Sequence, residues 1–147
     1  MSSPIRIKGL DKLNATLKRL PPTIKGSVLR QALRKGAKLI ESEAKSRVTK
    51  KGTGGLKRAL TTVVSQDKSG NQHATVGANK PDGSHIHLVE FGTSERLTTG
   101  KGKVPAGISR GRMPAQPFLR PAFDSRQDAA LGVIAAELDR AIAKATR

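Results

Sequence analysis

The chain contains only three aromatic residues, and all of them lie between residues 85 and 124. With no Trp and no Tyr among 147 residues, Phe91, Phe118 and Phe123 are the only aromatic side chains available to a core or an interface. Each can bury roughly 150 to 250 Å² of surface. The segment that carries them is therefore expected to organise both the fold and the function.

The length and composition indicate a single domain spanning residues 1–147. A chain of this size buries about 68 to 70% of its unfolded surface, which is enough for a core. The sequence has no cysteine, which excludes disulfides, thiol catalysis and cysteine-based metal sites. No apolar run approaches the ~18 residues of a membrane span, and the N-terminus lacks the apolar stretch of a signal peptide, so no membrane association is expected.

The net charge of +17 is unevenly distributed. Residues 1–58 hold 16 Lys and Arg against three acids, a balance of +13, whereas residues 59–147 hold 12 against eight, a balance of +4. Such an excess predicts attraction to polyanions or to acidic protein surfaces. For any single basic run, a simpler interpretation is that it solvates the outer face of an amphipathic helix.

Apolar residues at helical spacing predict helices over residues 9–20 and 22–49, separated by two prolines, and a C-terminal helix over 121–145. The face of the C-terminal helix is rich in alanine, which lets a neighbouring element approach closely. It is expected to pack across a sheet or against the helix 22–49. The apolar stripe of the first helix comprises Leu10, Leu13, Leu17 and Leu20.

Residues 59–91 are expected to form an antiparallel sheet. β-branched residues at 60–64, turn residues at 67–71 and alternation at 73–77 predict a hairpin, and a third strand is expected at 85–91. The sequence thus predicts an α+β fold, in which a long N-terminal helix and a C-terminal helix pack on a small antiparallel sheet of about three to four strands.

Residues 92–112 are expected to form a long basic loop that projects from the body, followed by a Pro-rich segment at 113–120. Five glycines and Pro105 interrupt regular structure, and structureless loops longer than ~12 to 15 residues are usually functional or disordered. We expect the loop to order only against a partner. Glu95 is the only acidic residue of this segment. Its five basic residues are the candidate assembly contacts: Arg96, Lys101, Lys103, Arg110 and Arg112.

A search for catalytic motifs is negative, since GxSxG, Walker-type and HExxH patterns are all missing. His85 and His87 would share one face of the expected strand, but a structural or solvent-facing role is favoured over a metal site because His73 is the only other histidine. Glu90 has no second acid to pair with and is expected to accept backbone or Arg hydrogen bonds. We therefore expect no enzyme activity, no catalytic residue, no cofactor and no bound metal.

Several segments carry a resemblance to a known family. IKGLDKLNATLKRLP (7–21), GGLKRAL (54–60), and HLVEFGTS (87–94) together with MPAQPFLRPAFD (113–124) resemble the HK97 gp10-like family of tailed-bacteriophage neck and tail-completion proteins. The resemblance spans nearly the whole chain, and VEFGTS with MPAQPFLRPA is its most specific part.

The resemblance implies a small α+β virion protein, assembled in the host cytoplasm, that forms a ring at the neck or tail top. The ring is expected to be a hexamer that helps to join tail to head, with DNA passing through its lumen. The implied partners are head-completion, tail-terminator or tail-tube proteins, with non-specific contact to packaged DNA. The family's motif positions map here onto Glu90, Phe91, Gly92, Thr93, Pro114, Pro117, Phe118, Leu119, Pro121 and Ala122.

The residues themselves favour a role of this motif as a clamp within the fold. Gly92 permits the turn out of the expected strand, the prolines stiffen the return, and Phe118 and Leu119 hold the start of the last helix near Phe91. An alternative function is a basic nucleic-acid-binding protein that uses the N-terminal helical face. The sequence shows neither a recognised DNA-reading signature nor stacking aromatics to support that alternative.

Overall fold

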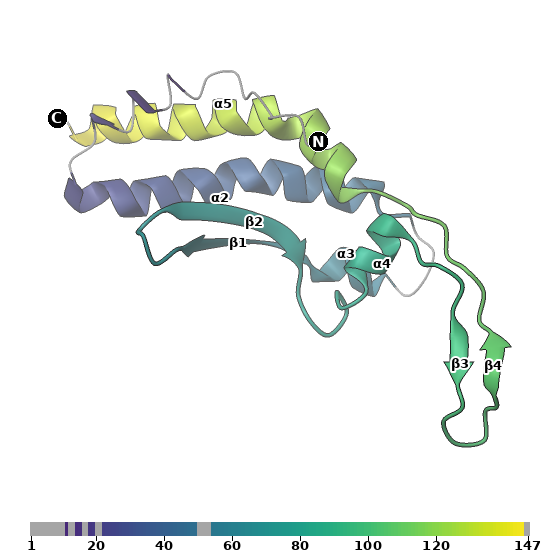
Figure 1. Ribbon diagram of the computed structural model, residues 1–147. Coiled ribbons are helices and arrows are strands. Elements are labelled where there is room, and N and C mark those ends of the chain that lie inside the picture. The colour runs from purple at the N-terminus through teal and green to yellow at the C-terminus, as the bar shows by residue number, and fades with distance from the viewer. Residues whose placement is uncertain (1–10, 12–13, 16–17, 20–21, 50–53, 146–147) are drawn as a thin grey trace.

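The computed structural model describes residues 11, 14–15, 18–19, 22–49 and 54–145 (Figure 1). Two long helices dominate it, α2 (Pro22–Arg47) and α5 (Leu119–Ala145). They lie side by side, and a two-stranded sheet covers the opposite side of α2 (Figure 1). Helix α2 is therefore the middle of three layers.

The sheet beside α2 is a hairpin of β1 (Leu60–Gln66) and β2 (Gln72–Ala78). The strands pair antiparallel over their full length. The sheet is tied to α2 by the hydroxyl of Thr62, which donates a 2.7 Å hydrogen bond to Glu41. A short helix, α3 (Gly55–Ala59), leads directly into β1.

Small side chains fill the contact between α2 and α5. One buried cluster joins Ala32 to Ile134 and Leu138, and a second contains four residues, Ala44, Leu60, Phe118 and Ala122. Gly36 belongs to the same contact, because a Cβ placed there would lie 2.6 Å from Cγ1 of Ile134 and 2.8 Å from the backbone oxygen of Ala130. The alanines and this glycine let the two helices approach closely.

The expected α+β fold with long N- and C-terminal helices is confirmed, as is the antiparallel hairpin expected within residues 60–77, but the expected number of strands in the sheet is wrong. The structure has two separate two-stranded antiparallel sheets instead of one sheet of three to four strands. Residues 85–91, expected as a third strand, instead contain helix α4 (Ile86–Phe91). In this helix Ile86 and Val89, three residues apart, both pack on the core around Phe118.

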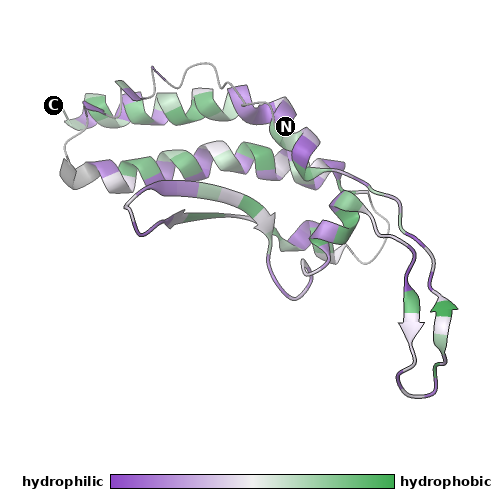
Figure 2. Cartoon of the chain, viewed as in Figure 1, coloured by the Kyte–Doolittle hydropathy of each residue, from purple (hydrophilic) through white to green (hydrophobic). Residues whose placement is uncertain are grey.

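The second sheet occupies the segment expected to be a loop. Strands β3 (Leu97–Thr99) and β4 (Ala106–Ser109) pair with an irregularity between Leu97 and Thr99. They form a hairpin that extends away from the helices (Figure 1), and hydrophilic residues precede β3 and follow β4 (Figure 2). We call residues 95–112 the arm. The expectation that this segment lacks regular structure is wrong, because only Gly107 among its glycines lies within a strand, and it does not prevent the short strands from pairing.

The helix boundaries differ modestly from those expected. The helix predicted over 22–49 ends at Arg47, and the C-terminal helix begins at Leu119 instead of residue 121. The predicted helix 9–20 falls largely outside the described residues, and so does its whole leucine stripe, although positions 11, 14, 15 and 18 are helical. Within the described part of the chain, neither long helix carries the apolar stretch needed to cross a membrane.

Replacing Gly36 by Ala is expected to destabilise the protein by about 1 to 3 kcal/mol. The new methyl group would overlap with Ile134 and the Ala130 backbone, and this overpacking outweighs the gain in helix propensity of about 1 kcal/mol. Gly132 on α5 is the matched control, because a Cβ there meets nothing within 4 Å, so Gly132→Ala should stabilise the fold. Urea unfolding measures both. A Gly36→Ala variant more stable than the unsubstituted protein would contradict the close approach of the helices.

Candidate assembly site

A single carboxylate joins α4 to the start of α5. The side chain of Glu90 is buried, with 7% of the residue exposed. Its Oε2 accepts hydrogen bonds from the backbone N–H groups of Phe118 (2.8 Å) and Leu119 (3.0 Å), and its Oε1 accepts one from Arg120 (3.1 Å). The first N–H groups of a helix have no partner within it, and negative charge is favoured at that end. Glu90 therefore serves as the cap of α5.

The local sequence completes this cap. Pro121 follows the three donors and has no N–H to satisfy, and the N–H of Ala122 donates to the carbonyl of Phe118 at 3.2 Å. Every backbone N–H from Phe118 to Ala122 therefore has an acceptor. Burial alone would raise the pKa of Glu90, but the three N–H donors outweigh it, so the pKa lies below its ordinary value.

Backbone hydrogen bonds extend the contact on either side of the carboxylate. The N–H of Gln116 donates to the carbonyl of Val89, and that of Thr93 donates to the carbonyl of Met113, both at 2.8 Å. In return, the N–H of Met113 donates to Oγ1 of Thr93 at 3.1 Å. Residues 89–93 and 113–116 thus run side by side and form the base of the arm.

Gly92 is required at this base by both conformation and space. Its φ of +74° is a conformation that side chains disfavour, and a Cβ there would lie 2.7 Å from the oxygen of Met113 and from the nitrogen of Ala115. The motif residues thereby hold two segments in contact that are more than 20 residues apart in sequence.

The aromatic side chains of the motif have opposite environments. Phe118 is 1% exposed and packs with Ala44, Leu60 and Ala122, and Leu119 packs against this cluster. Phe91, by contrast, is 80% exposed. The ring of Phe91 lies outside the buried cluster around Phe118, because α4 directs Ile86 and Val89 inward instead. The three motif prolines differ too: Pro114 and Pro117 are exposed and Pro121 is partly buried.

The arm presents its charged and apolar side chains to solvent. Its single acid, Glu95, accepts a 2.6 Å hydrogen bond from the hydroxyl of Ser109 across the hairpin. Leu97, Val104 and Ile108 are large apolar side chains that remain exposed. The five expected contact residues, Arg96, Lys101, Lys103, Arg110 and Arg112, are all exposed, and none of them forms an ion pair with an acid of the described residues.

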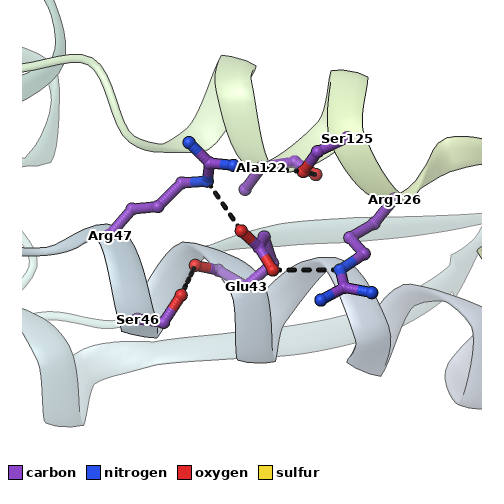
Figure 3. A network of polar contacts seen from close by, with 6 residues as sticks. All are labelled: Glu43, Ser46, Arg47, Ala122, Ser125 and Arg126. Carbon is purple, nitrogen blue, oxygen red and sulfur yellow. Dashed lines mark hydrogen bonds and ion pairs between the residues drawn. The ribbon is translucent and has the colours of Figure 1, made fainter.

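Two glutamates of the body form ion pairs that join the two long helices. Glu43 of α2 lies between Arg47 of the same helix and Arg126 of α5, at 2.9 Å from each (Figure 3). The hydrogen bond from Arg126 is the largest influence that lowers the pKa of Glu43. Glu137 of α5 likewise contacts Lys35 and Arg140 at 2.7 Å. Sequence reasoning missed these links between helices, although the spacing of Glu43 and Arg47 at i and i+4 hinted at the local pair.

Sequence reasoning also missed an open groove between α2, β2 and the first half of α5. The groove has a volume of about 640 Å³. Its charged residues are Arg120 and Asp124, and Gln127 also lines it. We call it the apolar groove, because most of its walls are aliphatic or aromatic, including Leu33, Ile40, Val76, Phe123 and Leu131.

The histidines have no shared site. Residues two apart point in different directions on a helix, so α4 removes the common face expected for His85 and His87. Both are exposed. Within the described residues, no group of three or more His, Cys, Asp or Glu side chains is arranged to hold a metal ion.

The sequence matches the model of a known protein family. A family model described as "Bacteriophage HK97-gp10, putative tail-component" matches residues 11–92. The match covers more than half of the chain and ends at Gly92, so it includes the Glu90 cap but not the arm or the Pro-rich segment. Searches among curated proteins and among solved structures returned no match.

Replacing Glu90 by Ala is expected to destabilise the protein by about 2 to 4 kcal/mol, because three backbone donors lose a charged acceptor at a buried site. Glu90→Gln keeps the shape and one acceptor oxygen and should cost less. Glu95→Gln, an exposed substitution on the arm, is the control and should change stability by about 0.5 kcal/mol or less. Denaturant unfolding compares the three, and equal stabilities for the Glu90 and Glu95 variants would exclude a capping role.

The free energy of unfolding should depend on pH in a way that reflects the ionisation of Glu90. Because the pKa of Glu90 is lower in the folded chain, its contribution is complete above the unfolded pKa of about 4.3 and is lost as pH falls through the folded value. Between about pH 5 and pH 3, the free energy of unfolding should therefore fall less steeply in Glu90→Gln than in the unsubstituted protein. Urea unfolding at several pH values measures the slopes, and identical slopes would contradict the assignment.

Proposed function

Since the chain belongs to the HK97 gp10-like family of phage tail components, and is thus a structural, tail-related protein of the virion, we propose that it forms a ring at the head–tail junction. In this proposal, six copies close a ring at the neck or tail top, and DNA passes through its lumen. The ring helps to join tail to head through surface contacts, without an enzymatic step.

The observation that carries the proposal is the arm. It extends away from the layered body (Figure 1), and its base is fixed by the Glu90 cap and the backbone bonds around Gly92. A solitary two-stranded hairpin is at best marginally stable, and exposed strand edges offer unpaired backbone groups. A rigidly anchored hairpin with exposed Leu97 and Ile108 is suited to pack against another protein layer.

The body supplies features that suit ring formation. In the described chain, β1 and β2 pair only with each other, so each leaves its outer edge unpaired. The face of this sheet that points away from α2 contains no Asp, Glu, Lys or Arg. It consists of Thr61, Val63, Ser65, His73, Thr75 and Gly77. Repeated contacts between copies can use such edges and faces, and cyclic symmetry satisfies them in every copy.

The charge of the arm indicates the chemistry of its partner. With Glu95 engaged by Ser109, five basic side chains remain without an acidic partner on the arm. An acidic surface on a head-completion, tail-terminator or tail-tube protein would complement them. Packaged DNA in the lumen is a second, non-specific contact in this proposal.

One observation favours the alternative function, binding of nucleic acid by the N-terminal helical face. Arg30, Arg34 and Lys38 follow one another at i+4 spacing on α2, and all three are exposed. A protein that binds DNA through such a stripe should lose affinity steeply between about 50 and 200 mM salt. Titration of duplex DNA over that range distinguishes a DNA binder from a neck protein whose main contacts are with protein.

The proposed function is tested by the composition and images of purified particles. The chain should be present in a fixed copy number, and antibody labelling should place it where the tail meets the head. Negative-stain images of the protein with its neck partners should show rings. Absence of the chain from purified particles would overturn the proposal.

Removing two positive charges from the tip of the arm is expected to impair joining without unfolding the protein. In the double variant Lys101→Gln with Lys103→Gln, two exposed charges at the arm's tip are lost, and we expect roughly tenfold fewer joined particles because charge complementarity guides docking. The matched control, Lys68→Gln with Lys80→Gln, removes the same charge from turns of the body. Counting full particles with and without tails by electron microscopy measures the effect. Equal losses in both variants would contradict a specific role of the arm.

A further inference from the structure

The exposed ring of Phe91 has no role within the described fold. It lies at the C-terminal end of α4 with 80% of its surface open, although Phe118 and Phe123 are the only other aromatic residues of the chain. Exposed aromatic side chains on rigid elements are frequent anchors of protein interfaces. The hydrogen bonds at the base of the arm hold its neighbours in place, so Phe91 is displayed on a fixed surface.

The surface around Phe91 carries no net charge. We call it the Phe91 patch: it is a shallow depression lined by Phe91, Thr93, Met113, Pro114 and Ala115, with Glu95 and Arg112 as its charged residues. One acid and one base therefore offset each other. This balance is unusual for a chain whose net charge is +17.

The apolar groove has complementary properties. It is open to solvent, is walled by side chains such as Leu33, Val76 and Phe123, and its charged residues are again one base and one acid, Arg120 and Asp124.

The charge of the chain favours a contact between the Phe91 patch of one copy and the apolar groove of another. Two copies of a chain with a net charge of +17 repel each other over most of their surface. The Phe91 patch and the apolar groove are neutral, so they can meet without this penalty. Each surface also offers the opposite charge to the other, Glu95 to Arg120 and Arg112 to Asp124.

We propose that Phe91 of one copy inserts into the apolar groove of a second copy. Because the patch and the groove are different surfaces of the same chain, the contact is head-to-tail, and its repetition generates a closed ring or a filament. This inference rests on the proposed function and deepens it by naming the contact between subunits. A patch that met its own equivalent would instead give a two-fold dimer.

The absence of native cysteine allows a direct test by site-specific crosslinking. Ala115→Cys places a thiol in the Phe91 patch while keeping the ring, and Gln127→Cys places one in the groove. The two single variants are mixed under the conditions in which rings form and treated with a short bifunctional thiol reagent. A crosslinked dimer that contains one chain of each variant is expected as the main product.

Two controls make the result decisive. Adding Phe91→Ala to the Ala115→Cys chain should lower the mixed dimer by about 30-fold, the loss typical of an interface anchor, while thermal unfolding of this exposed-site variant stays unchanged. Replacing Gln127→Cys by Ser69→Cys, an exposed site in the turn between β1 and β2, measures background reaction.

The inference is overturned if the mixed dimer does not exceed this background, if Phe91→Ala leaves its yield unchanged, or if two Ala115→Cys chains crosslink to each other instead. Rings in particles with only background crosslinking would retain the proposed function and remove this contact. If the chain crosslinks at the expected level but is absent from particles, the contact between copies stands and the proposed function falls.

Discussion

The structure depends on one buried carboxylate placed at the start of a long helix. Glu90 accepts hydrogen bonds from Phe118, Leu119 and Arg120, and this contact bridges 28 residues in sequence between Glu90 and the nearest donor. Because the two segments that enter and leave the arm meet at this point, the same contact fixes the helix, the base of the arm and the orientation of Phe91. A carboxylate at a helix start is stabilised by both its hydrogen bonds and the helix dipole.

The distribution of the other acids explains how a chain of this charge folds and still presents a basic exterior. Glu41, Glu43 and Glu137 form ion pairs with neighbouring basic side chains, and Glu43 and Glu137 also link α2 to α5. The arm and the outer stripe of α2 lack such compensation and keep their positive charge. In contrast, the Phe91 patch and the apolar groove each pair one acid with one base, which is why we propose them as the contact between copies of the chain.

The long helices and the first hairpin could be predicted because their apolar residues repeat at 3.6 and 2 residues over many positions. Helix α4 could not be predicted from its own sequence, because Ile86, Leu88 and Glu90 recur at every second position, as the residues on one face of a strand do. The inward orientation of Glu90 depends on its hydrogen bonds to the start of α5, which is distant in sequence. Strands β3 and β4 of the arm could not be predicted, because the segment is rich in glycine and the two strands pair with an irregular register. Its candidate basic residues were identified by composition alone, whereas the exposure of Phe91 and the groove depend on packing that no local pattern encodes.

The central claim is that the Glu90 carboxylate holds the start of α5 in place, and amide hydrogen exchange tests it most directly. The backbone N–H groups of Phe118, Leu119 and Arg120 should exchange slowly in the folded protein. In Glu90→Gln at neutral pH, their exchange should become markedly faster, while that of Ile134 and Leu138 in the middle of the helix keeps most of its protection. If exchange at the three capped positions is fast in the unsubstituted protein, or the same in both proteins, the carboxylate does not hold the helix start and the account is wrong.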